Sequence, residues 1–204
     1  MKRVADRVEV RVKDDGKGIP PEDVERVFDR FFTRRDEGGG TGLGLAMTRA
    51  IIDAHSGEIE VETSGGSIKA REIRGNLAAQ TSGGSIHVSE VSGNVEVETS
   101  GGPVRIRDVD GNVEAQTSGG SFSVRFTGAP AGELETSGGS IEVQFPSGKG
   151  VDLEAQTSGG RVTIDEEFTI SGSIERSQVE AKLNGGGAEL SLETSGGNIR
   201  VRAR

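Results

Sequence analysis

A short alternation of apolar and polar residues recurs through the last two-thirds of the chain. Ile86 and Val88 alternate with polar neighbours, and so do Val95 and Val97. A period of two is typical of a β-strand with one buried face, so each such unit predicts two short strands. The neighbouring units carry apolar residues at the same places, namely Ile68, Ala70, Leu77 and Ala79 before, and Val104, Ile106, Val113 and Ala115 after.

The turns between these strands share one motif, Thr-Ser-Gly-Gly. It occurs seven times, at residues 63–66, 81–84, 99–102, 117–120, 136–139, 157–160 and 194–197. The first four copies are 18 residues apart, the next two gaps are 19 and 21, and the last gap is 37, about two periods. A fixed period of this length is typical of a solenoid. We therefore expect residues 58–204 to form a β-solenoid (β-helix) of about 18 residues per rung and seven to eight rungs.

The corners of the expected rungs carry further predictions. Gly-Gly at one corner and Gly-Asn at the other tolerate the positive φ of tight turns. The Thr and Ser hydroxyls should form ladders along the outside of the stack. A calcium-binding β-roll needs an Asp after the glycines, and the residue there is Ser, Pro, Arg or Asn. We expect neither a metal site nor, since no helix follows the glycines, a phosphate cradle.

Residues 1–57 have a different pattern. Residues 7–13 alternate as in a strand, and apolar residues recur at helical spacing over 21–32 and 43–55. The fold class is therefore mainly β, a β-solenoid preceded by a small truncated α/β segment, with a domain boundary between residues 57 and 58.

Composition limits the chemistry of the chain. It has 33 glycines, 3% aromatic residues and no cysteine, which excludes disulfides and thiolate metal sites and indicates a thin core. Residues 1–57 hold 11 basic and 11 acidic side chains, so the net charge of −9 lies on residues 58–204, with 13 and 22. This balance argues against nucleic acid as a partner. No apolar run is long enough to span a membrane, and the start of the chain has no signal-peptide pattern, so we expect a cytoplasmic protein.

Three glycine and aromatic boxes in residues 1–57 stand in an order that closely resembles the C-terminal half of the GHKL ATP-binding domain of sensor histidine kinases. They are Asp-Asp-Gly-Lys-Gly-Ile at 14–19, the phenylalanines at 28, 31 and 32, and Gly-Thr-Gly-Leu-Gly at 40–44. The resemblance implies that the first box contacts adenine and that the second glycine box meets the phosphates at a helix start. The cofactor-binding residues it implies are Asp14, Gly16, Gly18, Ile19, Gly40, Thr41, Gly42, Leu43 and Gly44.

The same resemblance implies two missing parts. The family's magnesium-coordinating Asn box and its phosphoacceptor His helix have no counterpart among the six residues before Arg7. Phosphoryl transfer without the metal loses its main charge stabilisation. We therefore expect no catalytic residues, no metal and only weak ATP binding, and we lean against an enzyme.

Residues 58–204 resemble an adhesin-like family of bacterial β-solenoids, known by repeated Thr-Ser-Gly-Gly corners; residues 182–201 are similar to its terminal rung. The leading hypothesis is a non-catalytic structural or interaction protein that carries a kinase-derived remnant and binds a protein or surface ligand through the solenoid. The alternative is an ATP-binding sensor histidine kinase module, acting in phosphorelay signalling, with an appended solenoid. A third reading has a complete domain that starts upstream of Met1.

Overall fold

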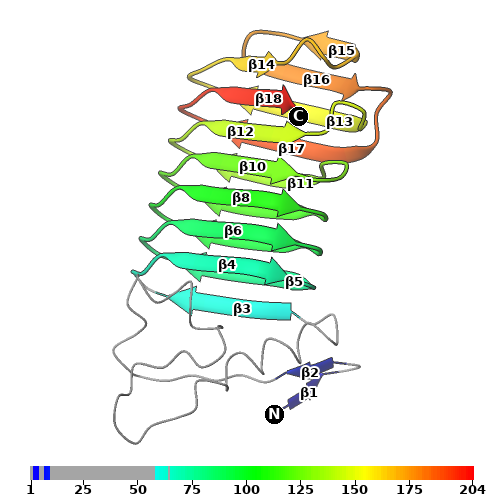
Figure 1. Ribbon diagram of the computed structural model, residues 1–204. Coiled ribbons are helices and arrows are strands. Elements are labelled where there is room, and N and C mark those ends of the chain that lie inside the picture. The colour runs from blue at the N-terminus through cyan, green and yellow to red at the C-terminus, as the bar shows by residue number, and fades with distance from the viewer. Residues whose placement is uncertain (1, 5–6, 10–57, 64) are drawn as a thin grey trace, which may run out of the picture.

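A computed structural model of the chain describes residues 2–4, 7–9, 58–63 and 65–204. Its main body is a stack of short strands that form two facing sheets, as Figure 1 shows. The described residues contain strands and turns but no helix. The helices expected over 21–32 and 43–55 lie outside them. Within residues 1–57 the structure describes one antiparallel pair, β1 (Lys2–Val4) and β2 (Arg7–Glu9), the second of which starts where the sequence predicts a strand.

Each rung contributes one strand to a nine-stranded sheet and, after a Thr-Ser-Gly-Gly corner, one strand to a seven-stranded sheet. The seven-stranded sheet runs, in spatial order, β14 (Val162–Ile164), β18 (Ile199–Ala203), β12 (Ile141–Phe145), β10 (Phe122–Phe126), β8 (Val104–Val109), β6 (Ile86–Val91), β4 (Ile68–Ile73). The nine-stranded sheet runs β15 (Ile170–Ile174), β16 (Gln178–Leu183), β13 (Val151–Thr157), β17 (Ala188–Thr194), β11 (Gly132–Thr136), β9 (Val113–Thr117), β7 (Val95–Thr99), β5 (Asn76–Thr81), β3 (Glu58–Thr63). The predicted β-solenoid is confirmed.

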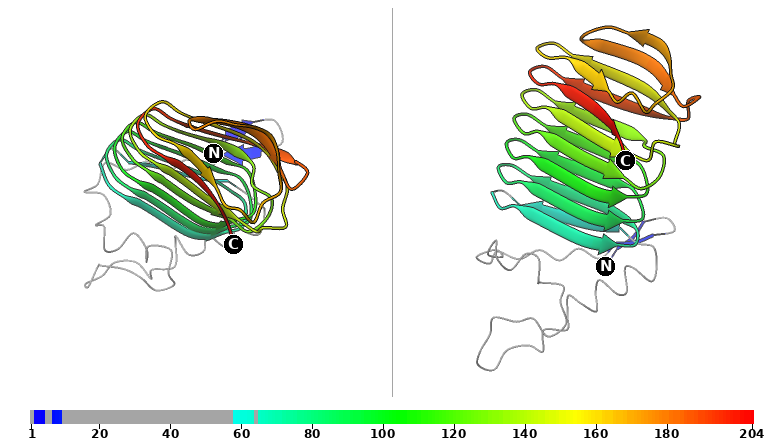
Figure 2. Two further views of the ribbon diagram at one scale, coloured as in Figure 1. Left: turned by 90° about the horizontal axis from the view of Figure 1, so that it is seen from above. Right: turned by 45° about the horizontal axis from the view of Figure 1, so that its top comes forward.

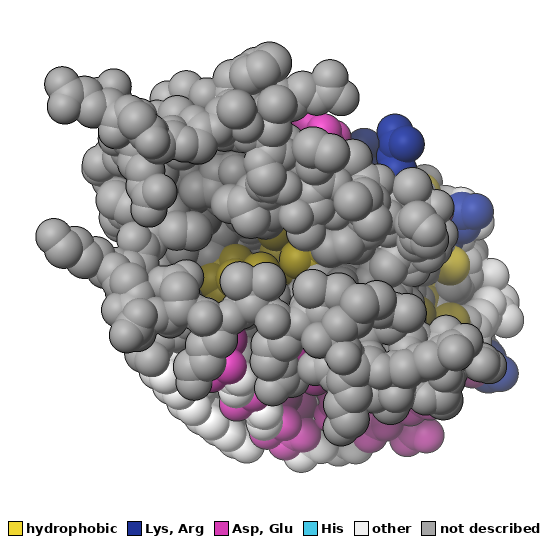
Figure 3. Space-filling model, turned by 90° about the horizontal axis from the view of Figure 1, so that it is seen from below, with side chains coloured by type: hydrophobic (Ala, Val, Ile, Leu, Met, Phe, Trp, Pro, Cys, Tyr) yellow, Lys and Arg dark blue, Asp and Glu magenta, His cyan; other side chains and the backbone are white. Residues whose placement is uncertain are grey.

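The core lies between the two sheets and consists of the apolar residues that alternate along every strand. Strands β7 and β9, for example, bury every second residue and expose the ones between. The apolar positions predicted from the repeat are buried, except that Ala70 is only partly buried. At the far end of the stack, Phe168 in the turn after β14 lies on Phe145 with the ring centroids 4.7 Å apart. Figure 3 shows the opposite end of the stack, where hydrophobic side chains are visible near the middle of the view.

The rungs do not stack in sequence order throughout. From β3 to β12 each new strand pairs in parallel with the strand two elements before it. The next rung, formed by β13 and β14, does not pair with the preceding rung of β11 and β12, and a space the width of one rung separates the two. The last strands of the chain, β17 and β18, fill that space, so that β17 pairs with both β11 and β13 (Figure 1).

The long interval before the last corner also contains an antiparallel hairpin. Strand β16 pairs antiparallel with β13 and with β15, which extends the nine-stranded sheet beyond the last parallel rung. Residues 182–201 therefore do not form the terminal rung in space, although they come last in the sequence (Figure 2).

The Thr-Ser-Gly-Gly corners keep their glycines for a reason that differs from the predicted positive φ. Among the corner glycines described, none has a φ in the left-handed region. The second glycine of a corner instead lies directly on the corner below: a Cβ on Gly120 would overlap the carbonyl group of Gly102. A Cβ on the first glycine, Gly119, would have its nearest neighbour at 3.7 Å. Close approach of the backbone therefore requires only the second glycine in this corner, whereas in the last two corners a Cβ on the first glycine, Gly159 or Gly196, would also lie 3.0 or 3.1 Å from a carbonyl oxygen.

The threonines of the corners face inward, so the prediction of an outer threonine ladder was wrong. The Thr136 hydroxyl donates to the carbonyl oxygen of Gly120 in the preceding rung at 2.8 Å and accepts from the backbone N–H of Gly139 at 3.2 Å. The same pair of bonds recurs at Thr81, Thr99, Thr117, Thr157 and Thr194. All six side chains are 2–3% exposed, so the hydroxyls satisfy backbone groups that water does not reach.

Candidate functional surfaces

The residues predicted to bind ATP belong to the N-terminal segment of the chain. Asp14, Gly16, Gly18, Ile19 and the glycine box at 40–44 all lie outside the described residues. Among the residues that the structure describes, no group of His, Asp or Glu side chains is arranged to hold a metal ion. The candidate surfaces of the described part are therefore the two outer faces of the solenoid.

The outer face of the nine-stranded sheet is acidic. Its outward positions carry a set of carboxylates that we call the acidic face: Glu60, Glu62, Glu96, Glu98, Glu114, Glu133, Glu135, Asp152, Glu154, Glu180, Glu189 and Glu193. Within the described strands of this sheet, Lys182 is the one basic residue, and it pairs with Asp152 at 3.5 Å. Figure 3 shows acidic side chains gathered along the lower side of the stack.

The parallel register brings these carboxylates close together. Glu96 lies directly opposite Glu114, and Glu114 opposite Glu133, on strands about 4.8 Å apart. Like charges in this position destabilise a sheet. A neighbouring row relieves the repulsion with glutamines: Gln80 donates to Glu98 at 2.8 Å and Gln116 to Glu135 at 3.2 Å. The row of Glu96 has no such spacers over these three rungs, so its negative charge is concentrated.

The outer face of the seven-stranded sheet is mainly basic. Its outward positions carry the set that we call the basic face: Lys69, Arg71, Arg105, Arg107, Arg125, Arg200 and Arg202. Arg105 lies opposite His87, and its guanidinium is 3.1 Å from the Nε2 atom of that half-buried ring. Glu142, in the same row, pairs with Arg202 at 3.2 Å.

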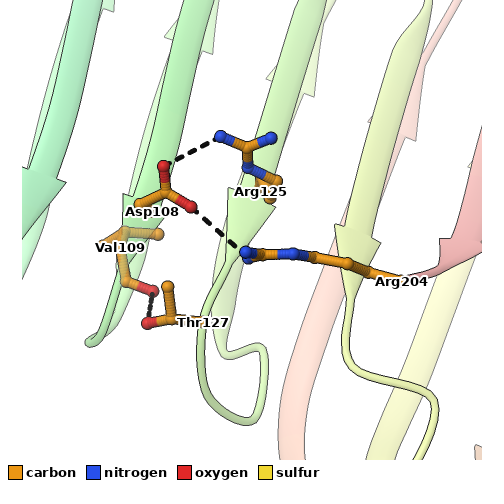
Figure 4. A network of polar contacts seen from close by, with 5 residues as sticks. All are labelled: Asp108, Val109, Arg125, Thr127 and Arg204. Carbon is orange, nitrogen blue, oxygen red and sulfur yellow. Dashed lines mark hydrogen bonds and ion pairs between the residues drawn. The ribbon is translucent and has the colours of Figure 1, made fainter.

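The best-connected part of the basic face is a network around Asp108. The Arg125 guanidinium donates to one oxygen of Asp108 at 2.8 Å, and Arg204 reaches the other at 3.4 Å (Figure 4). Asp108 has a φ of 56°, and the equivalent residues Glu72 and Glu90 have φ values of 55° and 58°. This left-handed conformation is uncommon outside glycine. It interrupts the alternation along the strand and sets an acidic side chain beside the arginines.

A shallow hollow of about 420 Å³ lies at the far end of the basic face. Arg161, Thr163, Asn198 and Arg200 line it. Asn198 accepts a bond from the backbone N–H of Arg161 at 3.0 Å, which fixes the corner beside the hollow. Two guanidinium groups, a hydroxyl and an amide make this hollow suited to an anion.

The net charge of residues 58–204 does not predict this separation of charge, because the sum hides which strands carry each sign. The signal is present in the polar positions of the strands. Two of the strands that precede a Thr-Ser-Gly-Gly corner read Val-Glu-Val-Glu and Gly-Glu-Leu-Glu, and none of the seven has a basic residue in the four positions before the corner. Two of the strands that follow a corner read Val-Arg-Ile-Arg and Ile-Arg-Val-Arg. Since the two sets of strands form opposite sheets, this alternation produces the two faces.

Comparison with known families divides the chain as its repeats do. The family described as Toastrack DUF4097 matches residues 44–202. The family described as Histidine kinase-, DNA gyrase B-, and HSP90-like ATPase matches residues 1–72. The two matches overlap over residues 44–72, where the pattern of the first strands fits both.

Curated relatives match the N-terminal part. The sensor protein kinase WalK of Staphylococcus saprophyticus is 48% identical over 69 residues, covering 30% of this chain and 11% of the kinase. WalK of Staphylococcus aureus is 46% identical over the same length, covering 17% of that sequence. The chain thus spans less than a fifth of these relatives. No solved structure matches the chain. Within the described residues, no helix has the length and apolar character needed to cross a membrane.

Proposed function

Since the chain belongs to the Toastrack DUF4097 family and carries a fragment of a GHKL ATPase domain at its N-terminus, we propose that it is a non-catalytic structural or interaction protein. In this proposal the solenoid carries the function. Its role is adhesin-like: it presents extended, rigid surfaces to which a partner binds. The observation that carries the proposal is the separation of charge onto two flat faces. Contact residues spread over many rungs suit the binding of a large surface.

The rigidity of the scaffold supports this role. Six corners are each fixed by a buried threonine that bonds two backbone groups, and the apolar core is continuous from β3 to β16. Outward side chains are therefore held at a constant spacing of about 4.8 Å along the stack. Preorganised charge costs little conformational entropy on binding.

A second candidate function rests on the N-terminal match. Residues 1–72 fit the ATPase family, and the WalK kinases share almost half of the aligned residues. An ATP-binding kinase module with an appended solenoid would use Asp14 for adenine and the glycine box at 40–44 for phosphate, as the resemblance implies. We propose a cytoplasmic location for the chain, which this second candidate requires because ATP is available there.

Nucleotide assays separate the two candidates. We expect no autophosphorylation and no ATP hydrolysis, and an ATP affinity weaker than about 1 mM, because the resemblance gives no magnesium ligands. Isothermal titration calorimetry of the full chain, with and without magnesium, measures this affinity. Micromolar, magnesium-dependent binding that is lost in Asp14→Ala would establish the kinase module instead.

A further inference from the structure

The two faces of the solenoid carry opposite charges on one rigid body. In the third rung, β7 presents Glu96 and Glu98 on the acidic face, and β8 presents Arg105 and Arg107 on the basic face. All four side chains are exposed. Each molecule thus offers both halves of a complementary pair, on opposite sides.

We propose that the acidic face of one copy docks onto the basic face of a second copy. The proposal rests on the proposed function, because it names a second copy of the chain as the partner of the solenoid. The two faces share one rung spacing, since each rung contributes a strand to both. Stacking one copy on another by translation across the faces therefore brings carboxylates and cations together at the rungs where both are present, as at β7 and β8.

Symmetry restricts how such copies associate. A two-fold dimer would place the acidic face on itself or the basic face on itself, and in both cases like charges would meet. The complementary arrangement is heterologous: the acidic face of each copy meets the basic face of the next. A heterologous contact that does not close into a ring grows as an open stack.

The area available implies weak association. Seven strands at about 4.8 Å, with about five residues each at about 3.3 Å, give a basic face of roughly 600 Å². A contact that buries this area on both copies totals about 1,200 Å², at the lower end of specific interfaces. Because exposed charges supply the complementarity, the affinity should fall steeply with salt.

Several arginines are already engaged within the molecule, which places the strongest contact in particular rungs. Asp108 holds Arg125, and Glu142 holds Arg202. Arg107 and Arg200 are exposed and pair with no carboxylate among the described residues. The third rung therefore offers the best site for a test.

Analytical ultracentrifugation of the full chain tests the proposal. We expect concentration-dependent association in about 10 mM salt and a monomer in about 0.5 M salt. Two variants each remove one face: R105E/R107E reverses charge on the basic face, and E96K/E98K does so on the acidic face. Each alone should associate at least about tenfold more weakly than the natural chain.

Mixing these two variants gives the decisive result. The intact acidic face of R105E/R107E still complements the intact basic face of E96K/E98K, and the two reversed faces complement each other as well. The mixture should therefore recover the association that each variant alone loses. Controls with the same change in net charge lie in turns away from both faces: K149E/R176E and E166K/E167K should associate like the natural chain. Circular dichroism establishes that every variant is folded.

Three results would overturn the proposal. They are a monomeric natural chain at low salt, association that the face variants leave unchanged, and a mixture that stays monomeric while both parents lose association. A monomeric natural chain that binds double-stranded DNA through Arg105 and Arg107 would assign the basic face to a polyanion. These results leave the proposed non-catalytic function standing, because the nucleotide assays decide it separately.

Discussion

Replacing the second glycine of one corner tests whether close stacking of the backbone holds the solenoid together. In Gly120→Ala, the new Cβ would overlap the carbonyl group of Gly102 in the rung below. Backbone atoms cannot rotate away as a side chain can, so the corner itself must move. Gly120 is also held on both sides by buried bonds, from its N–H to Thr117 at 3.2 Å and from Thr136 to its carbonyl oxygen at 2.8 Å.

The magnitude follows from these contacts. Overpacking typically costs about 1–3 kcal/mol, and weakening two buried hydrogen bonds adds about 1 kcal/mol each. We therefore expect Gly120→Ala to lower the free energy of unfolding by about 3–5 kcal/mol. In a chain of this size that loss lowers Tm by about 6–20 °C.

The neighbouring glycine provides the matched control. A Cβ on Gly119 would meet no atom closer than 3.7 Å, and the φ of this residue lies outside the left-handed region. Gly119→Ala should leave the stability unchanged or raise it by up to about 1 kcal/mol through the entropy of the unfolded chain. Urea unfolding followed by circular dichroism compares the two. Equal losses in both variants, or none in Gly120→Ala, would refute the stacking argument.

Two further predictions concern the threonine ladder and the inserted rung. Thr136→Val keeps the shape of the side chain but leaves the Gly120 carbonyl and the Gly139 N–H without the hydroxyl, so it should cost about 1–3 kcal/mol in urea unfolding. Thr136→Ser keeps the hydroxyl and should cost less, and the reverse order would contradict the assignment. Deleting residues 188–204 removes the rung between β11 and β13. Limited proteolysis should then cut residues 146–187 while the earlier rungs stay protected, and continued protection of 146–187 would show that the inserted rung is dispensable.

Much of the fold could be predicted because residues at equivalent positions of successive repeats pair with one another on neighbouring strands. Ile86, Val104 and Phe122 occupy the same place in successive units, and the structure pairs them directly. The order of the last rungs could not be predicted in this way. Alternation shows that residues 188–203 form strands, but it does not show which strands they pair with, because every rung offers the same kind of edge.

The corners and surfaces show a second limit. Glycine at position 120 has two physical explanations, positive φ and close approach, and only the backbone trace distinguishes them. Among residues other than glycine, the left-handed conformation is found instead at Glu72, Glu90, Asp108 and Asn184, which lie outside the Thr-Ser-Gly-Gly corners. The predicted nucleotide residues, from Asp14 to Gly44, lie outside the described residues and stay predictions.

The insertion of β17 and β18 also determines when, during synthesis of the chain, the solenoid can finish folding. Strands β13 and β14 are made first, yet their parallel neighbours on the inner side are the last strands to emerge. At about 5–20 residues per second, the interval from residue 157 to residue 204 lasts roughly 2 to 10 seconds. Strand pairing takes microseconds, so the edge of β11 stays open for a period that is long on the scale of folding. The nascent solenoid therefore cannot complete its core rung by rung, and the space beside β11 closes only once β17 and β18 have been made.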